Sequence, residues 1–149
     1  MRDIKYSRID SGFTLKWFVF EGEWILKITC GTDIIEIDRI EKAIEKGGKV
    51  FLNEIYTEKE IEYCEKRKKA KFQHYAARFA AKEAIFKAVN GLLVNKYDID
   101  WKNIEILNNE NGKPLIHFVD IKLENILSID LSISHCKKYA TANVVMIYE

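Results

Sequence analysis

The chain has 149 residues, near the common size of a single domain, and its 48% apolar and 32% charged residues are typical of a globular protein. Its 24 basic and 23 acidic residues leave a net charge of +1, which points to neither nucleic acid nor a membrane surface as a partner. The apolar run Trp17–Phe20 is too short for a signal peptide or a membrane span, and three scattered cysteines indicate no disulfide framework, so we expect a cytoplasmic protein.

The first part of the chain divides into an extension and a domain. Residues 1–23 show no recognisable chemistry and are interpreted as an N-terminal extension, followed by a single domain over residues 24–149. Trp24–Cys30 is rich in β-branched and apolar residues, which predicts a strand.

A break and a short helix are expected next. Gly31–Asp33 interrupts the apolar pattern, and Ile34–Lys46 repeats isoleucines at helical spacing before Gly47 and Gly48. Asp38 and Glu41 resemble a capping box near the start of this helix. Asp33 would then lie at a strand-to-helix junction, where its carboxylate is both held and accessible.

Two further helices surround a basic segment. Thr57, followed by Glu60 three residues later, predicts a capped helix that carries Ile61 and Cys64 inward. The run Lys66–Lys71 contains five basic residues in six, and its ordinary interpretation is a solvated helix end. A long helix over Tyr75–Ala88 follows and is expected to end near Asn90 and Gly91.

The long helix carries an acidic residue among aromatic ones. At 100° per residue, Phe72, Phe79 and Phe86 fall within about 40° of one another, and Glu83 lies between them. This stripe is expected to face inward, where a carboxylate must be paired or bound to a cation. The alternative is an ordinary surface pair with Lys87 four residues later.

The remaining residues predict strands. Ile104–Leu107 and Pro114–Val119 flank a turn, Leu123–Leu127 is expected to form a helical turn or two, and Ile129–His135 alternates with His135 on the inward face. Tyr139–Tyr148 is expected to be a central strand. The order predicts an α+β fold with helices packed on a largely antiparallel sheet.

Several side chains are candidates for chemistry. Asp33 and Glu83, on separate elements, would form a hard-oxygen site suited to Mg²⁺ if they converge, although Asp33 could equally cap a turn. Arg78 and Lys82 share one flank of the long helix and could face an acidic partner or a phosphate. For His135, a hydrogen-bonded core histidine is the interpretation that the strand pattern favours.

Four segments resemble one enzyme family, the holo-[acyl-carrier-protein] synthases, which are small bacterial 4′-phosphopantetheinyl transferases. They are Gly31–Ile40 (GTDIIEIDRI), Arg78–Ala88 (RFAAKEAIFKA), Asn111–Pro114 (NGKP) and Leu131–His135 (LSISH). The resemblance implies the fold of that family. It also implies transfer of 4′-phosphopantetheine from coenzyme A to a serine of apo-acyl carrier protein, in fatty acid biosynthesis.

The resemblance also implies roles for individual residues. Asp33 and Glu83 match the family residues that hold Mg²⁺ with the coenzyme A pyrophosphate, and Lys87 matches one that contacts a coenzyme A phosphate. Arg39 and Arg78 are similar to residues that dock the acidic carrier protein. The serine proton would pass to Glu83 or to a metal-bound water, with His135, a candidate cofactor-binding residue, as the weaker acceptor.

Three features depart from the family pattern. Some 22 residues precede the matching region, the segment Val89–Asn95 replaces a short glycine-rich loop, and the basic run Lys66–Lys71 is longer than usual. Family members commonly form trimers, so the resemblance implies a homotrimer. The alternative from another class is a non-catalytic module that binds acidic protein or nucleic acid through Lys66–Lys71, and such a module should tolerate Asp33→Ala.

Overall fold

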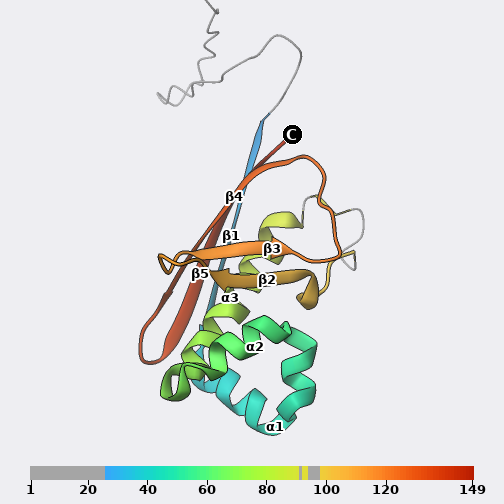
Figure 1. Ribbon diagram of the computed structural model, residues 1–149. Coiled ribbons are helices and arrows are strands. Elements are labelled where there is room, and N and C mark those ends of the chain that lie inside the picture. The colour runs from blue at the N-terminus through green and yellow to red at the C-terminus, as the bar shows by residue number, and fades with distance from the viewer. Residues whose placement is uncertain (1–25, 91, 94–97) are drawn as a thin grey trace, which may run out of the picture.

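Helix α3 lies between a three-stranded sheet and the other helices (Figure 1). The computed structural model describes residues 26–90, 92–93 and 98–149. The proposed N-terminal extension 1–23 therefore lies outside the described residues, as does the predicted strand start at Trp24. The elements in chain order are β1 (Lys27–Glu36), α1 (Ile37–Ile55), α2 (Glu58–Glu65), the 3₁₀ turn η1 (Lys68–Ala70), α3 (Lys71–Val89), the 3₁₀ turn η2 (Trp101–Asn103), β2 (Ile104–Asn108), β3 (Pro114–Phe118), β4 (Ile126–His135) and β5 (Tyr139–Tyr148).

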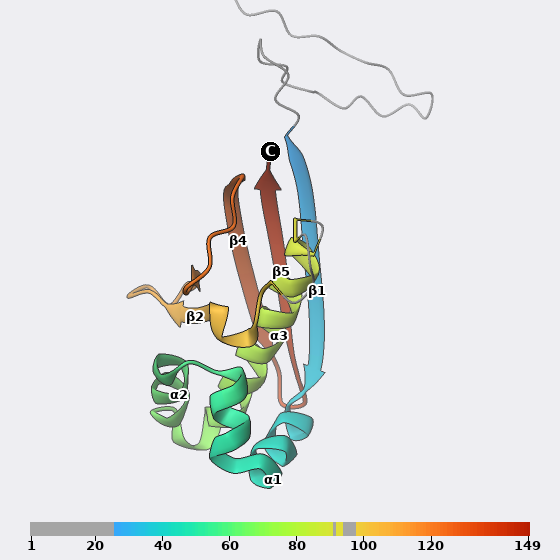
Figure 2. The ribbon, with the colours of Figure 1, turned by 90° about the vertical axis from the view of Figure 1, so that its right-hand side faces the viewer.

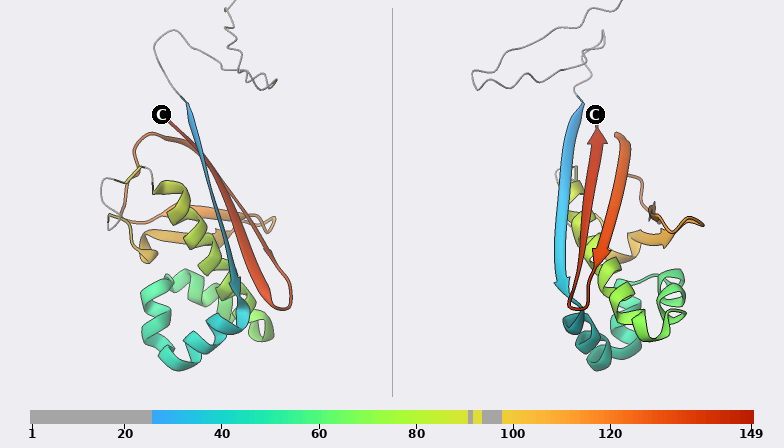
Figure 3. Two further views of the ribbon diagram at one scale, coloured as in Figure 1. Left: turned by 180° about the vertical axis from the view of Figure 1, so that it is seen from behind. Right: turned by 90° about the vertical axis from the view of Figure 1, so that its left-hand side faces the viewer.

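The larger sheet has the order β1-β5-β4, and both pairings are antiparallel. The predicted central position of the last strand is confirmed. Ala140, Ala142 and Val144 of β5 are buried on the face that α3 covers, because small side chains let a helix lie close to a sheet. The right-hand view of Figure 3 shows the opposite face of this sheet with none of the described helices over it.

A second, two-stranded sheet joins β2 and β3 antiparallel, as the sequence predicts. It lies beside β4 and packs on α2 and α3 (Figure 1). The α+β fold with helices packed on antiparallel strands is thus confirmed. Among the described residues, no helix combines the length and the apolar character that crossing a membrane requires.

The first strand and helix differ from the prediction. Strand β1 does not break at Gly31–Asp33 but continues to Glu36, since it pairs with β5 along its whole length. Asp33 therefore lies inside a strand. The predicted cap is also wrong, because the side chain of Asp38 accepts a hydrogen bond from Lys42 and Glu36 provides no side-chain cap. The glycine pair ends the first helical segment, as predicted, because Gly48 leaves helical geometry (φ 55°, ψ −138°). A second helical segment follows it directly, so α1 as a whole continues to Ile55.

The segment before β4 also differs. Residues Leu123–Leu127, expected as helical turns, contain no helix, and β4 begins at Ile126 opposite Tyr148. An irregularity in the register between Ile126 and Ser128 hides the alternating pattern there. The predicted capping box of Thr57 and Glu60 is confirmed at the start of α2.

The inward stripe of α3 is not the aromatic one. Tyr75, Arg78, Lys82, Ile85 and Val89 are fully or almost fully buried at spacings of three, four, three and four residues. The predicted stripe is only half-buried, and two of its members pack against Trp101 of η2. They are Phe79, stacked with a ring-centre separation of 4.9 Å, and Phe86, edge-on at 5.1 Å.

The inward stripe places a positive charge in the interior, where Glu60 neutralises it. The ammonium of Lys82 lies 2.8 Å from Glu60 Oε2, and neither side chain is exposed. Lys82 also donates to the backbone carbonyls of Ile55 and Trp101, both at 2.8 Å. Glu60 accepts from the backbone amide of Ile106 at 3.0 Å. The pair thereby connects four elements to α3, namely α1, α2, η2 and β2.

We expect Glu60→Gln to lower the free energy of unfolding by about 3–5 kcal/mol, because it leaves the Lys82 charge buried without its partner. Burial already lowers the pKa of Lys82, so the interior offers that charge no solvent compensation. Urea denaturation measures the loss. Glu62→Gln is the matched control, since the Glu62–Lys66 pair is exposed to solvent and its loss should change the free energy of unfolding little. Equal losses in the two variants would contradict the assignment.

Candidate active site

Asp33 reaches α3 because β1 lies directly on that helix. Figure 2 shows β1 running alongside α3. Gly31 touches this helix, and Asp33, two residues later on the same strand, projects toward the same face. A Cβ atom added at Gly31 would lie 1.9 Å from the backbone oxygen of Ala84, which no side chain tolerates. The strand and the helix are therefore in contact through their backbones at this point, and Asp33 follows immediately.

The carboxylate of Asp33 pairs with Lys87. Lys87 Nζ lies 2.8 Å from Asp33 Oδ1 and donates a second hydrogen bond, also 2.8 Å, to the carbonyl of Thr32. On the neighbouring strand, Thr141 Oγ1 donates to the backbone oxygen of Asp33 at 2.8 Å. The Asp33 side chain is 15% exposed and that of Lys87 is 49% exposed, so the pair lies at the protein surface with the carboxylate on its inner side.

Glu83 lies one turn before Lys87 on α3 and is half-buried. Burial, and next the nearby Asp33 carboxylate, raise the pKa of Glu83 above its usual value, whereas the Lys87 ammonium lowers it. As pH falls, Glu83 therefore loses its charge at a higher pH than an ordinary glutamate does. The structure thus brings Asp33, Glu83 and Lys87 together, from two elements some fifty residues apart in the chain.

These three residues have the chemistry of a site for Mg²⁺ and phosphate. Two carboxylates and no neutral ligand suit a hard cation that keeps several waters and takes further oxygens from a substrate. The lysine supplies a mobile charge for an anion. Within residues 26–90, 92–93 and 98–149 there is no group of three or more His, Cys, Asp or Glu side chains that could hold a metal by themselves. Asp33 and Glu83 would therefore need oxygens from water or substrate.

Arg78 does not lie on an exposed flank. It is buried, with its guanidinium 3.9 Å from the ring centre of Tyr63, and its Nη2 donates to Asn108 Oδ1 at 2.9 Å. Nη1 donates to the carbonyl of His74 at 3.4 Å, and Nε has no hydrogen-bond partner. The expectation that Arg78 and Lys82 face a partner is therefore wrong for this chain, because both point into the interior. Arg39, by contrast, is exposed on α1.

His135 is exposed rather than part of the core, so that interpretation is wrong. The prediction that His135 points to the inner face of its strand is correct, since its ring centre lies 5.9 Å from that of His74 on α3. Burial, followed by Arg78, lowers the pKa of His74 to about 4, so His74 is neutral at physiological pH. His135 lies on β4, the edge opposite β1, roughly 10 Å from the Asp33 strand. Within one chain it does not join the Asp33 group.

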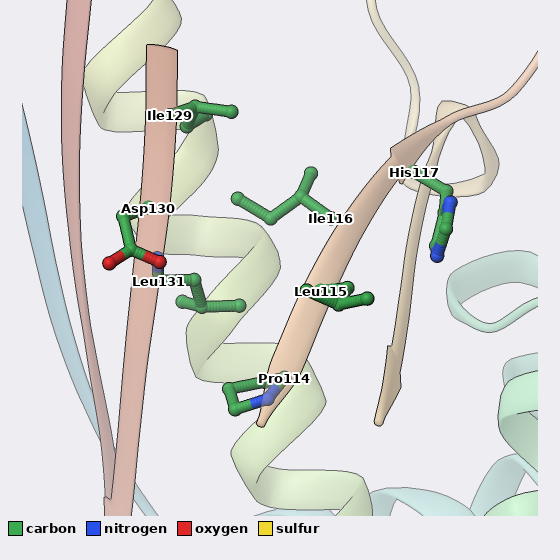
Figure 4. A pocket seen from close by; sticks show the side chains of 7 residues that line it. All are labelled: Pro114, Leu115, Ile116, His117, Ile129, Asp130 and Leu131. Carbon is green, nitrogen blue, oxygen red and sulfur yellow. The ribbon is translucent and has the colours of Figure 1, made fainter. Parts of the chain in front are cut away.

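A small cavity of about 180 Å³ lies between β3 and β4 (Figure 4). The side chains around it are mainly aliphatic, and its Asp130 is paired with Lys113 at 2.7 Å. Asp33, Glu83 and Lys87 do not line it, and it lies at the far edge of the sheet from β1. The cavity is therefore separate from the group of Asp33, Glu83 and Lys87.

Sequence reasoning missed two residues that position Asp33. Gly31 was expected to end the strand, whereas it permits the close contact with Ala84. Thr141, which holds the Asp33 carbonyl, carries no signal in the sequence because the contact spans 108 residues. A glycine inside a strand can also mark close backbone approach, and this signal was available.

The chain matches the 4′-phosphopantetheinyl transferase superfamily over residues 29–144. It is 45% identical to the holo-[acyl-carrier-protein] synthase of Ruminiclostridium cellulolyticum, over 81% of this chain and 92% of that one. The corresponding protein of Fusobacterium nucleatum is 46% identical, over 80% and 98% of the two chains.

Solved structures agree with these matches. The Bacillus anthracis holo-(acyl-carrier-protein) synthase in complex with CoA (3′,5′-ADP) is 38% identical with a TM-score of 0.66, covering 81% of this chain and 96% of that one. The Helicobacter pylori holo-[acyl-carrier-protein] synthase in complex with coenzyme A is 34% identical with a TM-score of 0.67, covering 78% and 98%.

We expect Asp33→Asn to lower the pKa of Glu83 toward its ordinary value, because the substitution removes the neighbouring negative charge. A ¹³C NMR titration of glutamate-labelled protein measures this directly. Asp38→Asn is the control, since Asp38 is an exposed acid on α1 paired with Lys42, and it should leave Glu83 unchanged. An unchanged pKa of Glu83 in Asp33→Asn would show that the two carboxylates do not interact.

Proposed function

The chain belongs to the 4′-phosphopantetheinyl transferase superfamily, and we propose that it is a holo-[acyl-carrier-protein] synthase. It transfers 4′-phosphopantetheine from coenzyme A to a serine hydroxyl of apo-acyl carrier protein, in cytoplasmic fatty acid biosynthesis. The serine oxygen bonds to the phosphorus that carries pantetheine, and adenosine 3′,5′-bisphosphate leaves. The observation that carries this proposal is the convergence of Asp33, Glu83 and Lys87 within the family match.

The reaction is proposed to require Mg²⁺. Asp33 and Glu83 would hold the ion, and their carboxylate oxygens fit its preference for hard ligands. When bound, the ion supplies charge neutralisation to the pyrophosphate of coenzyme A. The proximity of the two carboxylates supports this assignment, because a pair that raises the pKa of one member is stabilised by a cation.

The remaining steps use the side chains of the chain itself. Lys87, half-exposed on the last turn of α3, places a positive charge within reach of a coenzyme A phosphate. Glu83 is our candidate for the acceptor of the serine proton, since a raised pKa makes its carboxylate a stronger base than an ordinary glutamate. His135 is the weaker candidate, because it lies at the other edge of the sheet.

Docking of the acidic carrier protein is assigned first to Arg39. Its side chain is exposed on α1, the helix that follows the Asp33 strand directly. Arg78 was proposed for the same role, but contact with a carrier would require its neighbours Tyr63 and Asn108 to move. Arg39 needs no such rearrangement.

A homotrimer is proposed, assembled through the open face of the larger sheet. Ile28, Ile34 and Val145 lie on that face and are 72%, 64% and 51% exposed. Large apolar side chains exposed on one face of a sheet are typical of a protein interface. Figure 3 shows no described element of the same chain over this face of the sheet.

We expect Asp33→Asn and Glu83→Gln each to lower Mg²⁺-dependent transfer by at least about 100-fold, as loss of a charge-stabilising group does in other enzymes. Intact mass measures the gain of phosphopantetheine on apo-acyl carrier protein incubated with coenzyme A and Mg²⁺. Asp38→Asn should retain activity. A folded wild-type protein that gives no mass gain, but binds nucleic acid in a salt-dependent way, would instead support the binding-module alternative.

We expect Val145→Lys to shift the assembly toward monomers, because a charge at this position would be buried in the interface. Sedimentation velocity measures the assembly state. Val50→Lys is the matched control, since Val50 is also an exposed valine but lies on α1, away from the sheet. A wild-type monomer, or an unchanged Val145→Lys assembly, would contradict the proposed interface.

A further inference from the structure

The lysine of the active site already occupies the place of a cation. Lys87 Nζ lies 2.8 Å from Asp33 Oδ1, and its positive charge also acts on Glu83. A second hydrogen bond to the Thr32 carbonyl holds the ammonium on β1. We propose that Lys87 is a built-in counter-ion of the Asp33–Glu83 pair, which a divalent metal must displace, so that metal binding depends on coenzyme A. This inference rests on the proposed function.

The competition follows from where the charges lie. Asp33 is 15% exposed, so water solvates its carboxylate poorly and its partner matters. A metal that binds Asp33 without coenzyme A has to break the contact with Lys87 or accept a positive charge beside it. Both alternatives weaken the binding of the metal.

Coenzyme A removes this obstacle because its pyrophosphate is an anion. Lys87 has a flexible four-carbon side chain that is half-exposed, so it can leave Asp33 for a phosphate oxygen. The carboxylates are then free for the metal, which gains phosphate oxygens as further ligands. Metal and coenzyme A should therefore strengthen each other's binding, and thermodynamic linkage requires the two effects to be equal.

The test is a titration of the full chain with Mn²⁺, an oxygen-seeking stand-in for Mg²⁺, followed by electron paramagnetic resonance of the free ion. It is performed with and without coenzyme A, for the wild type and for Lys87→Met, which keeps a similar side-chain length without the charge. We expect Lys87→Met to bind Mn²⁺ about fivefold more tightly than the wild type in the absence of coenzyme A, the upper range for a partly exposed ion pair. The strengthening of Mn²⁺ binding by coenzyme A should fall by at least the same factor.

Two further variants sharpen the result. Lys42→Met removes the partner of the exposed Asp38 carboxylate and should leave Mn²⁺ binding unchanged. Lys87→Arg keeps the positive charge and should keep most of the strengthening by coenzyme A. Circular dichroism shows that each variant is folded before it is titrated.

The inference would be overturned if, without coenzyme A, Lys87→Met bound Mn²⁺ within about twofold as tightly as the wild type. Lys87 would then be a phosphate contact alone. Weaker Mn²⁺ binding in that variant would also overturn it, because Lys87 would then serve to hold β1 against α3. The proposed function fails on a different result, namely that wild-type protein with Mg²⁺ and coenzyme A transfers nothing to apo-acyl carrier protein.

Discussion

The buried pair of Lys82 and Glu60 is the interaction on which the helical half of the protein depends. An uncompensated charge in the interior would cost several kcal/mol, a large part of the 5–15 kcal/mol that stabilises a typical domain. The pair avoids this cost because each of its members is saturated with hydrogen bonds from other elements, including the carbonyls of Ile55 and Trp101 and the amide of Ile106. The ends of α1 and η2 are therefore tied to α3 at a single point.

This arrangement gives α3 two kinds of charged residue with different tasks. Lys82 and Arg78 point inward and are satisfied within the chain, apart from Arg78 Nε. Glu83 and Lys87, on the side toward β1, remain accessible to ligands. The interior contacts involve the side of α3 that faces the core, and the close approach of Gly31 to Ala84 places β1 against the same helix.

The sequence predicted most of the strands and the long helix, and it singled out Asp33, Glu83 and Lys87, whose roles stay a prediction. Periodicity and capping explain the first two, whereas the site rested largely on the family resemblance. The errors have a common cause, which is that local pattern does not reveal what an element packs against. Gly31–Asp33 looked like a break because pairing with β5 cannot be read from neighbours in the chain. Arg78 and Lys82 looked like a solvent-facing flank because their partners, Asn108 and Glu60, come from other elements.

The contact of Gly31 with Ala84 has a consequence for how the site tolerates change. When two elements are separated by flexible side chains, the distance between them varies with the side-chain conformers. Here the backbone of β1 at Gly31 touches the backbone of α3 at Ala84, so the strand cannot move closer to the helix. The separation between the backbone positions of Asp33 and Glu83 is therefore set by this backbone contact. Any side chain at Gly31 would push β1 away from α3 and would therefore change this separation.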